Sequence, residues 1–298
     1  MKKKLSRNLG LYIMLILPIL FFIVFRYVPM SNIVVAFKDY NLILGTWKSP
    51  WAGFKYFKQA FGDNSFWNAL KNTFVLNGLD LVIGFPVPII LAILLNELVS
   101  VRYKRIVQTV LYMPHFLSWI IISGIAFQIF APSTGLLNQF ITSFGGKPIP
   151  FLTDAAHWVG TYVGLGLWQS MGWNTIIYLA AITSIDPTLY EAAEIDGAGR
   201  FAKMRNITLP SISPTIITML IMNLGRILST EFDRPWSLRN TRLQDVADVL
   251  STYVYRLGIR DNRIALATAV GLFQSVVCVI FLVIANQVAK KFGEDGIW

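Results

Sequence analysis

Residues 191–210, EAAEIDGAGRFAKMRNITLP, decide how the rest of this chain is interpreted. The stretch is polar and lies between two long apolar runs. Just before it, Asp186 and Pro187 are typical of a helix start, because aspartate caps free amides and proline needs no donor there. Gly197 then permits a stop and a sharp bend. We therefore predict two short helices joined at an angle, which present a surface for docking.

The composition is that of a membrane protein. Of 298 residues, 55% are hydrophobic and only 14% are charged, and the mean hydropathy is +0.56. Basic residues beside membrane spans set topology and contact lipid headgroups, so the net charge of +10 indicates membrane lipid rather than nucleic acid. One cysteine excludes an intrachain disulfide, and the two histidines have no ligand cluster around them, so we expect no metal site.

The apolar runs predict an all-α integral membrane protein made of a single domain, 1–298, with six transmembrane helices. The predicted spans are 9–29, 72–95, 106–130, 158–185, 212–230 and 264–289. Two longer segments, 30–71 and 231–263, are expected outside the cell, and the second should carry a surface helix over 243–258. Pro86 and Pro88 are expected to bend the second span.

Orientation follows from the basic residues near the ends of short loops. Lys2, Lys3, Lys4 and Arg7 precede the first span, and the short turn 96–105 is also basic. Both features predict cytoplasmic N- and C-termini in a multi-pass plasma-membrane protein. The long outer segments contain many arginines too, so the count alone does not decide the orientation.

Glu191, Ala192, Ala193, Asp196 and Gly197, followed after nine residues by Ile207, Leu209 and Pro210, resemble the EAA loop of importer-type ABC transporter permeases. The resemblance implies the importer-type permease fold, with 186–210 as the loop that couples to the ATPase. It also implies two separate ATP-binding subunits, a second permease subunit and an extracellular solute-binding lipoprotein. ATP and magnesium would be used by the partner ATPase, since this chain has no phosphate-binding loop and no catalytic motif.

Two softer resemblances point to the substrate. Residues 167–174, LWQSMGWN, look like the fourth-span pattern of sugar permeases of the maltose type, and 245–255, DVADVLSTYVY, look like the branch for complex saccharides. Neutral polyols bind through hydrogen bonds and aromatic stacking. Candidate pathway residues are the polar and aromatic ones in the spans: Asn77, Asp80, Gln128, Trp168, Gln169, Trp173, Asn174, Asn223 and Gln274.

Asp80 is the most specific of these candidates, because a carboxylate within an apolar run is costly unless it faces a polar cavity or a partner charge. Each amide or tryptophan could instead satisfy a neighbouring helix. The leading hypothesis is a permease for an oligosaccharide or a polysaccharide-derived sugar. The alternatives are a permease for a non-sugar solute and an ion-coupled secondary carrier.

Overall fold

The computed structural model describes residues 9–291 and 296–297, so the basic N-terminal cluster and most of the C-terminal tail lie outside the described residues. The described part is helical, with one isolated β-bridge between Lys38 and Trp51 and no strand. The chain divides into two compact units. The first unit contains Met1–Asn64 and Val254–Phe273, and the second contains Ser65–Tyr253 and Gln274–Trp298.

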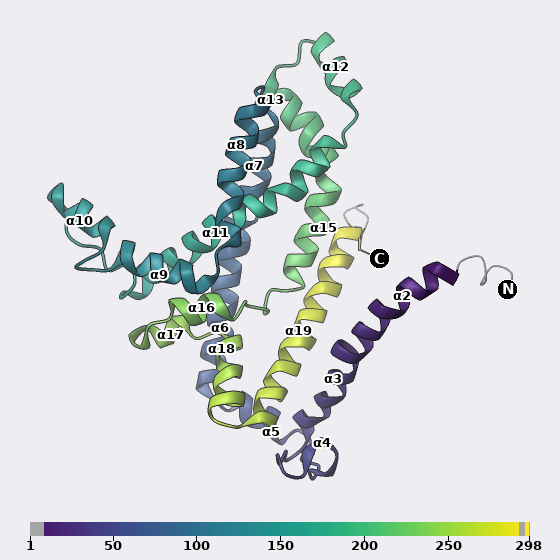
Figure 1. The fold of residues 1–298 in the computed structure, drawn as a ribbon, viewed down its shortest axis with the longest axis vertical. Coiled ribbons are helices and arrows are strands. Elements are labelled where there is room, and N and C mark those ends of the chain that lie inside the picture. Colours follow the sequence, from purple (N-terminus) through teal and green to yellow (C-terminus); the bar gives the residue numbers. More distant parts are fainter. Residues whose placement is uncertain (1–8, 292–295, 298) are drawn as a thin grey trace. The chain divides into compact units, whose positions relative to one another are not determined.

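The helices are drawn in Figure 1. Those before residue 135 are α2 (Leu9–Phe22), η1 (Ile23–Tyr27), α3 (Val28–Met30), η2 (Ser31–Phe37), α4 (Gly45–Lys48), α5 (Lys55–Phe61), α6 (Asn64–Leu79), η3 (Asp80–Gly84), α7 (Pro86–Asn96), α8 (Val101–Tyr112), η4 (Met113–Phe116) and α9 (Trp119–Phe130). Those after it are α10 (Leu136–Ser143), α11 (Ala155–Thr183), α12 (Pro187–Ile195), α13 (Arg200–Lys203), η5 (Met204–Thr208), α14 (Leu209–Ser211), α15 (Ser213–Leu224), α16 (Asp233–Leu238), η6 (Thr241–Leu243), α17 (Gln244–Ala247), α18 (Leu250–Tyr255), η7 (Arg256–Arg260) and α19 (Ile264–Lys291).

The first unit contains one uninterrupted helix, Gly10–Phe37. No residue of its most apolar stretch is buried inside the structure. The helix continues past Pro29, where the sequence pattern ended the span, and the π-helical turn η1 directly precedes the short helix α3 that contains this proline. The following segment folds back on itself: Lys38 Nζ donates to the carbonyls of Thr46 and Trp47 at 2.9 and 2.8 Å. Lys55 pairs with Asp39 at 2.6 Å.

Three helices of the described part are long and apolar enough to cross a membrane, or up to five if each bent pair is one span. Asn64–Asn96 and Ile264–Lys291 match predicted spans and extend beyond them. Pro86 and Pro88 do not interrupt the first of these. They follow the π-helical turn η3, and α7 continues to Asn96.

The predicted third span, 106–130, is not one straight helix. Val101–Phe116 and Trp119–Phe130 meet at 101°. Pro114 lies in the 3-10 turn that ends the first arm, and Leu117 is extended. Ser118 then starts α9, since its side chain accepts from the Ile121 amide. A proline followed by a new N-cap residue therefore divides the predicted span into two helices. The apolar content of the sequence alone does not reveal this break.

The fourth predicted span is a continuous helix, α11, of 29 residues. It is long enough to cross a membrane but less apolar than the three helices named above, because Gln169 and Asn174 interrupt its apolar sequence. The fifth, α15, is shorter than predicted: it ends at Leu224, and residues 225–230 form turns and irregular chain. Arg200–Ser211 approaches α15 with a bend of 57°.

The helix predicted for 243–258 is not continuous: α17, α18 and η7 are helical, but they are divided by a break. The chain breaks at Asp248, whose backbone is extended, and Asp248 Oδ1 accepts from Thr252 Oγ1 at 2.7 Å. Residues 254–258 belong to the first unit, whereas the part 243–253 packs into the second. Asn72 Nδ2 holds it by donating to the Asp245 and Asp248 carbonyls at 2.8 and 2.9 Å.

The main core of the second unit joins α9, α11 and the segment 238–249. Its largest fully buried side chains include Trp158 and Tyr162, whose rings stack at 5.1 Å. Trp158 Nε1 donates to the Leu238 carbonyl at 2.9 Å. Burying the indole with its N–H satisfied lets this segment lie against α11 without leaving an unpaired polar group.

Candidate functional site: a polar cavity and a coupling segment

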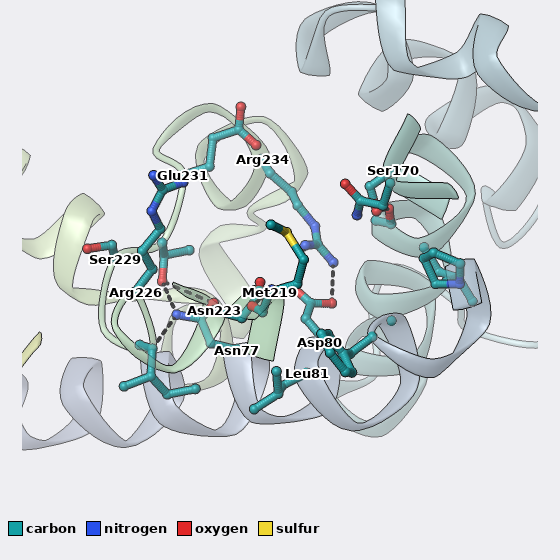
Figure 2. A pocket seen from close by; sticks show the side chains of 18 of the residues that line it. Asn77, Asp80, Leu81, Ser170, Met219, Asn223, Arg226, Ser229, Glu231 and Arg234 are labelled. Carbon is teal, nitrogen blue, oxygen red and sulfur yellow. Dashed lines mark hydrogen bonds and ion pairs between the residues drawn. The ribbon is translucent and has the colours of Figure 1, made fainter. Parts of the chain in front are cut away.

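A cavity of about 320 Å³ lies in the second unit (Figure 2). One wall is the end of α6, η3 and the start of α7. The other walls come from α11, α15 and residues 225–234. The π-helical turn η3 carries Asp80 at its first position, and this wider turn places the carboxylate on the cavity wall.

Asp80 faces Arg234. The two guanidinium nitrogens of Arg234 donate to the two Asp80 oxygens, at 2.6 and 3.1 Å, in a bidentate pair. Nη2 also donates to the Tyr162 carbonyl at 2.7 Å, and the guanidinium lies 3.8 Å from the centre of the Tyr162 ring. The side chains are 11% and 30% exposed for Arg234 and Asp80. Asp80 therefore has the partner charge that its place in an apolar run requires.

Arg234 fits against α11 because residue 166 is glycine. A Cβ at Gly166 would overlap the guanidinium of Arg234, with Nη1 at 2.6 Å. On its other side Arg234 lies 5.4 Å from the centre of the Trp119 ring. The cation is thus enclosed by two aromatic rings and a carboxylate.

A second pair of opposite charges lines the cavity. Glu231 Oε2 accepts from Trp119 Nε1 at 2.9 Å. Arg226, five positions earlier, is exposed, and no hydrogen bond or ion pair of its guanidinium is found among the described residues. The cavity therefore contains one cation that is held and one that is available.

Of the predicted pathway residues, the cavity brings together Asn77, Asp80 and Asn174, and also Asn223. Asn77 Nδ2 donates to the Ile227 carbonyl at 2.7 Å, so part of this amide fixes the chain after α15. Asn223 Nδ2 donates within its own helix, to the Met219 carbonyl at 2.8 Å.

The other predicted pathway residues do not line this cavity. Trp168 lines a separate apolar groove between α9 and α11, and Trp173 stacks on His115 at 4.5 Å. Gln169 and Gln274 donate to backbone carbonyls, at 3.3 and 2.9 Å. These side-chain amides form hydrogen bonds with the backbone of neighbouring segments. That was the alternative role left open by the sequence analysis. Gln128 is exposed on α9 and lies outside the cavity.

The predicted two-helix segment is present at 187–203. Asp186 caps α12 by accepting from the Thr188 amide at 2.9 Å, and this backbone hydrogen bond lowers the pKa of Asp186. Gly197 has φ +77°, a left-handed conformation that favours glycine, whereas Gly199 at φ −71° does not need it. Figure 1 shows α12 and α13 at the same end of the second unit as the connection between α7 and α8.

The segment 186–210, called the coupling segment below after the role that the sequence resemblance implies, presents apolar side chains to solvent. Ile195 is 87% exposed and Phe201 is 75% exposed, one on each side of the Gly197 bend. Glu191, Ala192 and Asp196 are also exposed. Of the other residues in the EAA pattern, Ala193 and Ile207 are half-buried and Leu209 and Pro210 are exposed.

The two short helices are tied to each other by side chains. Lys203 Nζ donates to Glu194 Oε1 at 2.7 Å, and this hydrogen bond lowers the pKa of Glu194. Tyr190 and Thr208 hydroxyls lie 2.9 Å apart. The second contact joins α12 to the chain that leads into α15. It therefore provides a direct connection between a displacement of α12 and the next long helix.

Comparison with known proteins identifies the family. Residues 84–293 match the model of the family described as binding-protein-dependent transport system inner membrane component. The chain belongs to this family. Protein LplB of Bacillus subtilis (strain 168) is 46% identical, over 99% of this chain and 92% of LplB. The polygalacturonan/rhamnogalacturonan transport system permease protein YteP of the same organism is 44% identical, over 99% of this chain and 92% of YteP.

The fold of this permease matches solved structures. A chain of a bacterial ABC transporter involved in the import of the acidic polysaccharide alginate has a TM-score of 0.89 and 40% identity, covering 97% of this chain and 98% of that one. A second structure of the bacterial alginate ABC transporter, in complex with an alginate pentasaccharide-bound periplasmic protein, gives 0.90 and 39%, covering 99% of each chain. The permease is a membrane component, and in this family ATP hydrolysis belongs to separate subunits.

Sequence reasoning missed several residues of the permease cavity, above all Arg234, Glu231, Arg226 and Tyr162. Arg234 lies in what the sequence marked as an outer segment, and 154 residues separate it from Asp80. A carboxylate in an apolar run indicates that a basic side chain elsewhere in the chain pairs with it. The chain offers many arginines, and no local pattern says which one does so.

Proposed function

We propose that this permease forms half of the translocation pathway of an ATP-driven ABC importer for an oligosaccharide or a polysaccharide-derived sugar. A second permease subunit supplies the other half, two ATP-binding subunits use ATP and magnesium, and an extracellular solute-binding lipoprotein delivers the substrate. Family membership and the saccharides named for YteP and for the alginate importer support this proposal.

We further propose a single domain with six spans and cytoplasmic termini. Four long helical segments support it: Gly10–Phe37, Asn64–Asn96, Ala155–Thr183 and Ile264–Lys291. The two bent pairs that end in α9 and α15 would supply the others. The basic start of α8 and the coupling segment lie at the same end of the second unit, which supports a cytoplasmic position for both (Figure 1).

The coupling segment carries the proposal. Ile195 and Phe201 are exposed apolar side chains among charged ones, which is the arrangement expected of a docking surface with a polar rim. A groove on an ATP-binding subunit would cover both. Closure of that subunit would then move α12, and Tyr190 and Thr208 would carry the motion toward α15.

The cavity is our proposed part of the substrate pathway, with Asn77, Asp80 and Asn174 on its walls. The remaining candidates, Trp168, Gln169, Trp173 and Gln274, would act indirectly by holding α11 and the chain after α15. Arg234 neutralises Asp80, so this carboxylate is not available to bind a transported cation.

The decisive experiment is co-purification and uptake with altered coupling residues. Glu191→Lys and Gly197→Asp should release the ATP-binding subunits and abolish ATP-driven sugar uptake, while the protein still inserts into membranes. Asp261→Lys, a charge reversal at an exposed position in the first unit, is the control and should change neither. Normal subunit binding and uptake in both coupling variants would refute the proposal, as would uptake driven by an ion gradient without ATP.

A further inference from the structure

Most carboxylate oxygens of the cavity wall already have a hydrogen-bond donor. Both Asp80 oxygens and Glu231 Oε2 already accept a hydrogen bond. In contrast, the Arg234 Nε–H and the Tyr162 hydroxyl are buried and have no partner among the described residues. Tyr162 is only 1% exposed, so water does not readily satisfy it. An occupant of the cavity cannot reach these two buried atoms either, so the exposed side chains on the wall, Arg226 and Asn174 among them, decide which ligand it binds.

Four charged side chains line the cavity, and the two exposed ones are Arg226 and Glu231, of which Glu231 accepts from Trp119 Nε1. Arg234 is neutralised by Asp80 in a bidentate pair. Arg226 contributes a second guanidinium, and no partner for it is found in the part of the chain that the structure describes. Its backbone is fixed, because the Arg226 amide donates to the Asn223 carbonyl at 3.0 Å in the turn that ends α15. A guanidinium held at a cavity wall is suited to a planar, two-oxygen anion.

The groups around Arg226 suit a sugar that carries such an anion. Figure 2 shows Arg226 and Asp80 on opposite sides of Asn77, so the available cation is separated from the carboxylate that Arg234 occupies. Asn174, on α11, has no hydrogen-bond partner for its amide among the residues that the structure describes, and it can bind a hydroxyl. The volume of about 320 Å³ is at the lower end of the range for small-ligand sites.

We propose that the cavity selects saccharide units that carry a carboxylate, and that Arg226 is the residue that binds this carboxylate. The inference rests on the proposed saccharide uptake and adds the chemical class of the substrate. Arg234 would not bind the anion directly, since Asp80 holds it. It would set the position of Tyr162 and keep the opposite wall electrically neutral.

The test compares two probes of the same length in the complete transporter. Proteoliposomes that contain both permeases and the ATP-binding subunits are supplied with the binding protein and either trigalacturonate or its carboxyl-reduced neutral counterpart. We expect ATP-driven uptake to favour trigalacturonate. Arg226→Gln should lower the ratio of acidic to neutral uptake by about tenfold or more, since it removes a charged hydrogen bond. Arg226→Lys should retain part of the preference.

Arg260→Gln is the matched control, because Arg260 is exposed and lies in the first unit, outside the cavity. It should leave the ratio unchanged. Uptake by the Arg226→Gln transporter with an unchanged ratio, including an equal loss for both probes, overturns the assignment of Arg226 while saccharide import stands. Absence of ATP-driven uptake of either probe in the unaltered transporter refutes the import proposal itself.

Discussion

Asp80→Asn should destabilise the second unit more than its half-buried position suggests. The substitution removes the carboxylate that accepts two hydrogen bonds from Arg234, whose side chain is 11% exposed. Breaking one partner of a fully buried ion pair costs about 3–5 kcal/mol. Asp80 is 30% exposed, and water can reach part of the site, so we expect a loss of about 2–3 kcal/mol in the free energy of unfolding.

Unfolding of the purified permease in detergent micelles by added dodecyl sulfate would measure this loss. Arg234→Gln should cost a similar amount, and the double variant Asp80→Asn/Arg234→Gln should cost clearly less than the sum, because no charge is left unpaired. Gly166→Ala tests the same contact without removing a charge, since its Cβ would overlap the guanidinium. Gly164→Ala on the same helix is the control, with nothing within 4 Å of its Cβ.

Additive effects of the two charge variants would refute the reasoning. The same conclusion would follow if Gly166→Ala were as stable as Gly164→Ala. Either result would mean that the pair is dispensable to the packing of α11 against the chain after α15, and that the cavity wall is held by other contacts.

Three further predictions concern single positions. Gly172→Ala should lower stability by about 1–3 kcal/mol relative to Gly164→Ala, because its Cβ would overlap a backbone carbonyl of α8; thermal unfolding measures it. Gly197→Ala should cost about 1 kcal/mol and weaken binding of the ATP-binding subunits, whereas Gly199→Ala should do neither. The pKa of Asp186 is lowered in the fold, so its cap is complete above about pH 4 and is lost as the pH falls through the lowered pKa. Protection of the amides at the start of α12, measured against the intrinsic exchange rate at each pH, should therefore fall in acid, but not in Asp186→Asn, which caps without titrating.

The sequence by itself determined the features that depend on neighbouring residues. Asp186 and Pro187 start α12, and Gly197 bends the chain with φ +77°, because caps and left-handed turns are settled within a few positions. The last span was also predictable, since an uninterrupted apolar run closed by Lys290 and Lys291 gives one helix, Ile264–Lys291.

Only the tertiary structure decided the features that join distant parts of the chain. The sequence marked Asp80 as needing a partner, but the choice of Arg234 depends on Gly166 leaving room for the guanidinium against α11. The break in 243–258 likewise follows from Asn72, which binds two carbonyls of that segment and holds it in the core. The physical reason is the same in both cases. A buried charge or carbonyl must find a partner, and which partner it finds is set by packing among residues far apart in the sequence.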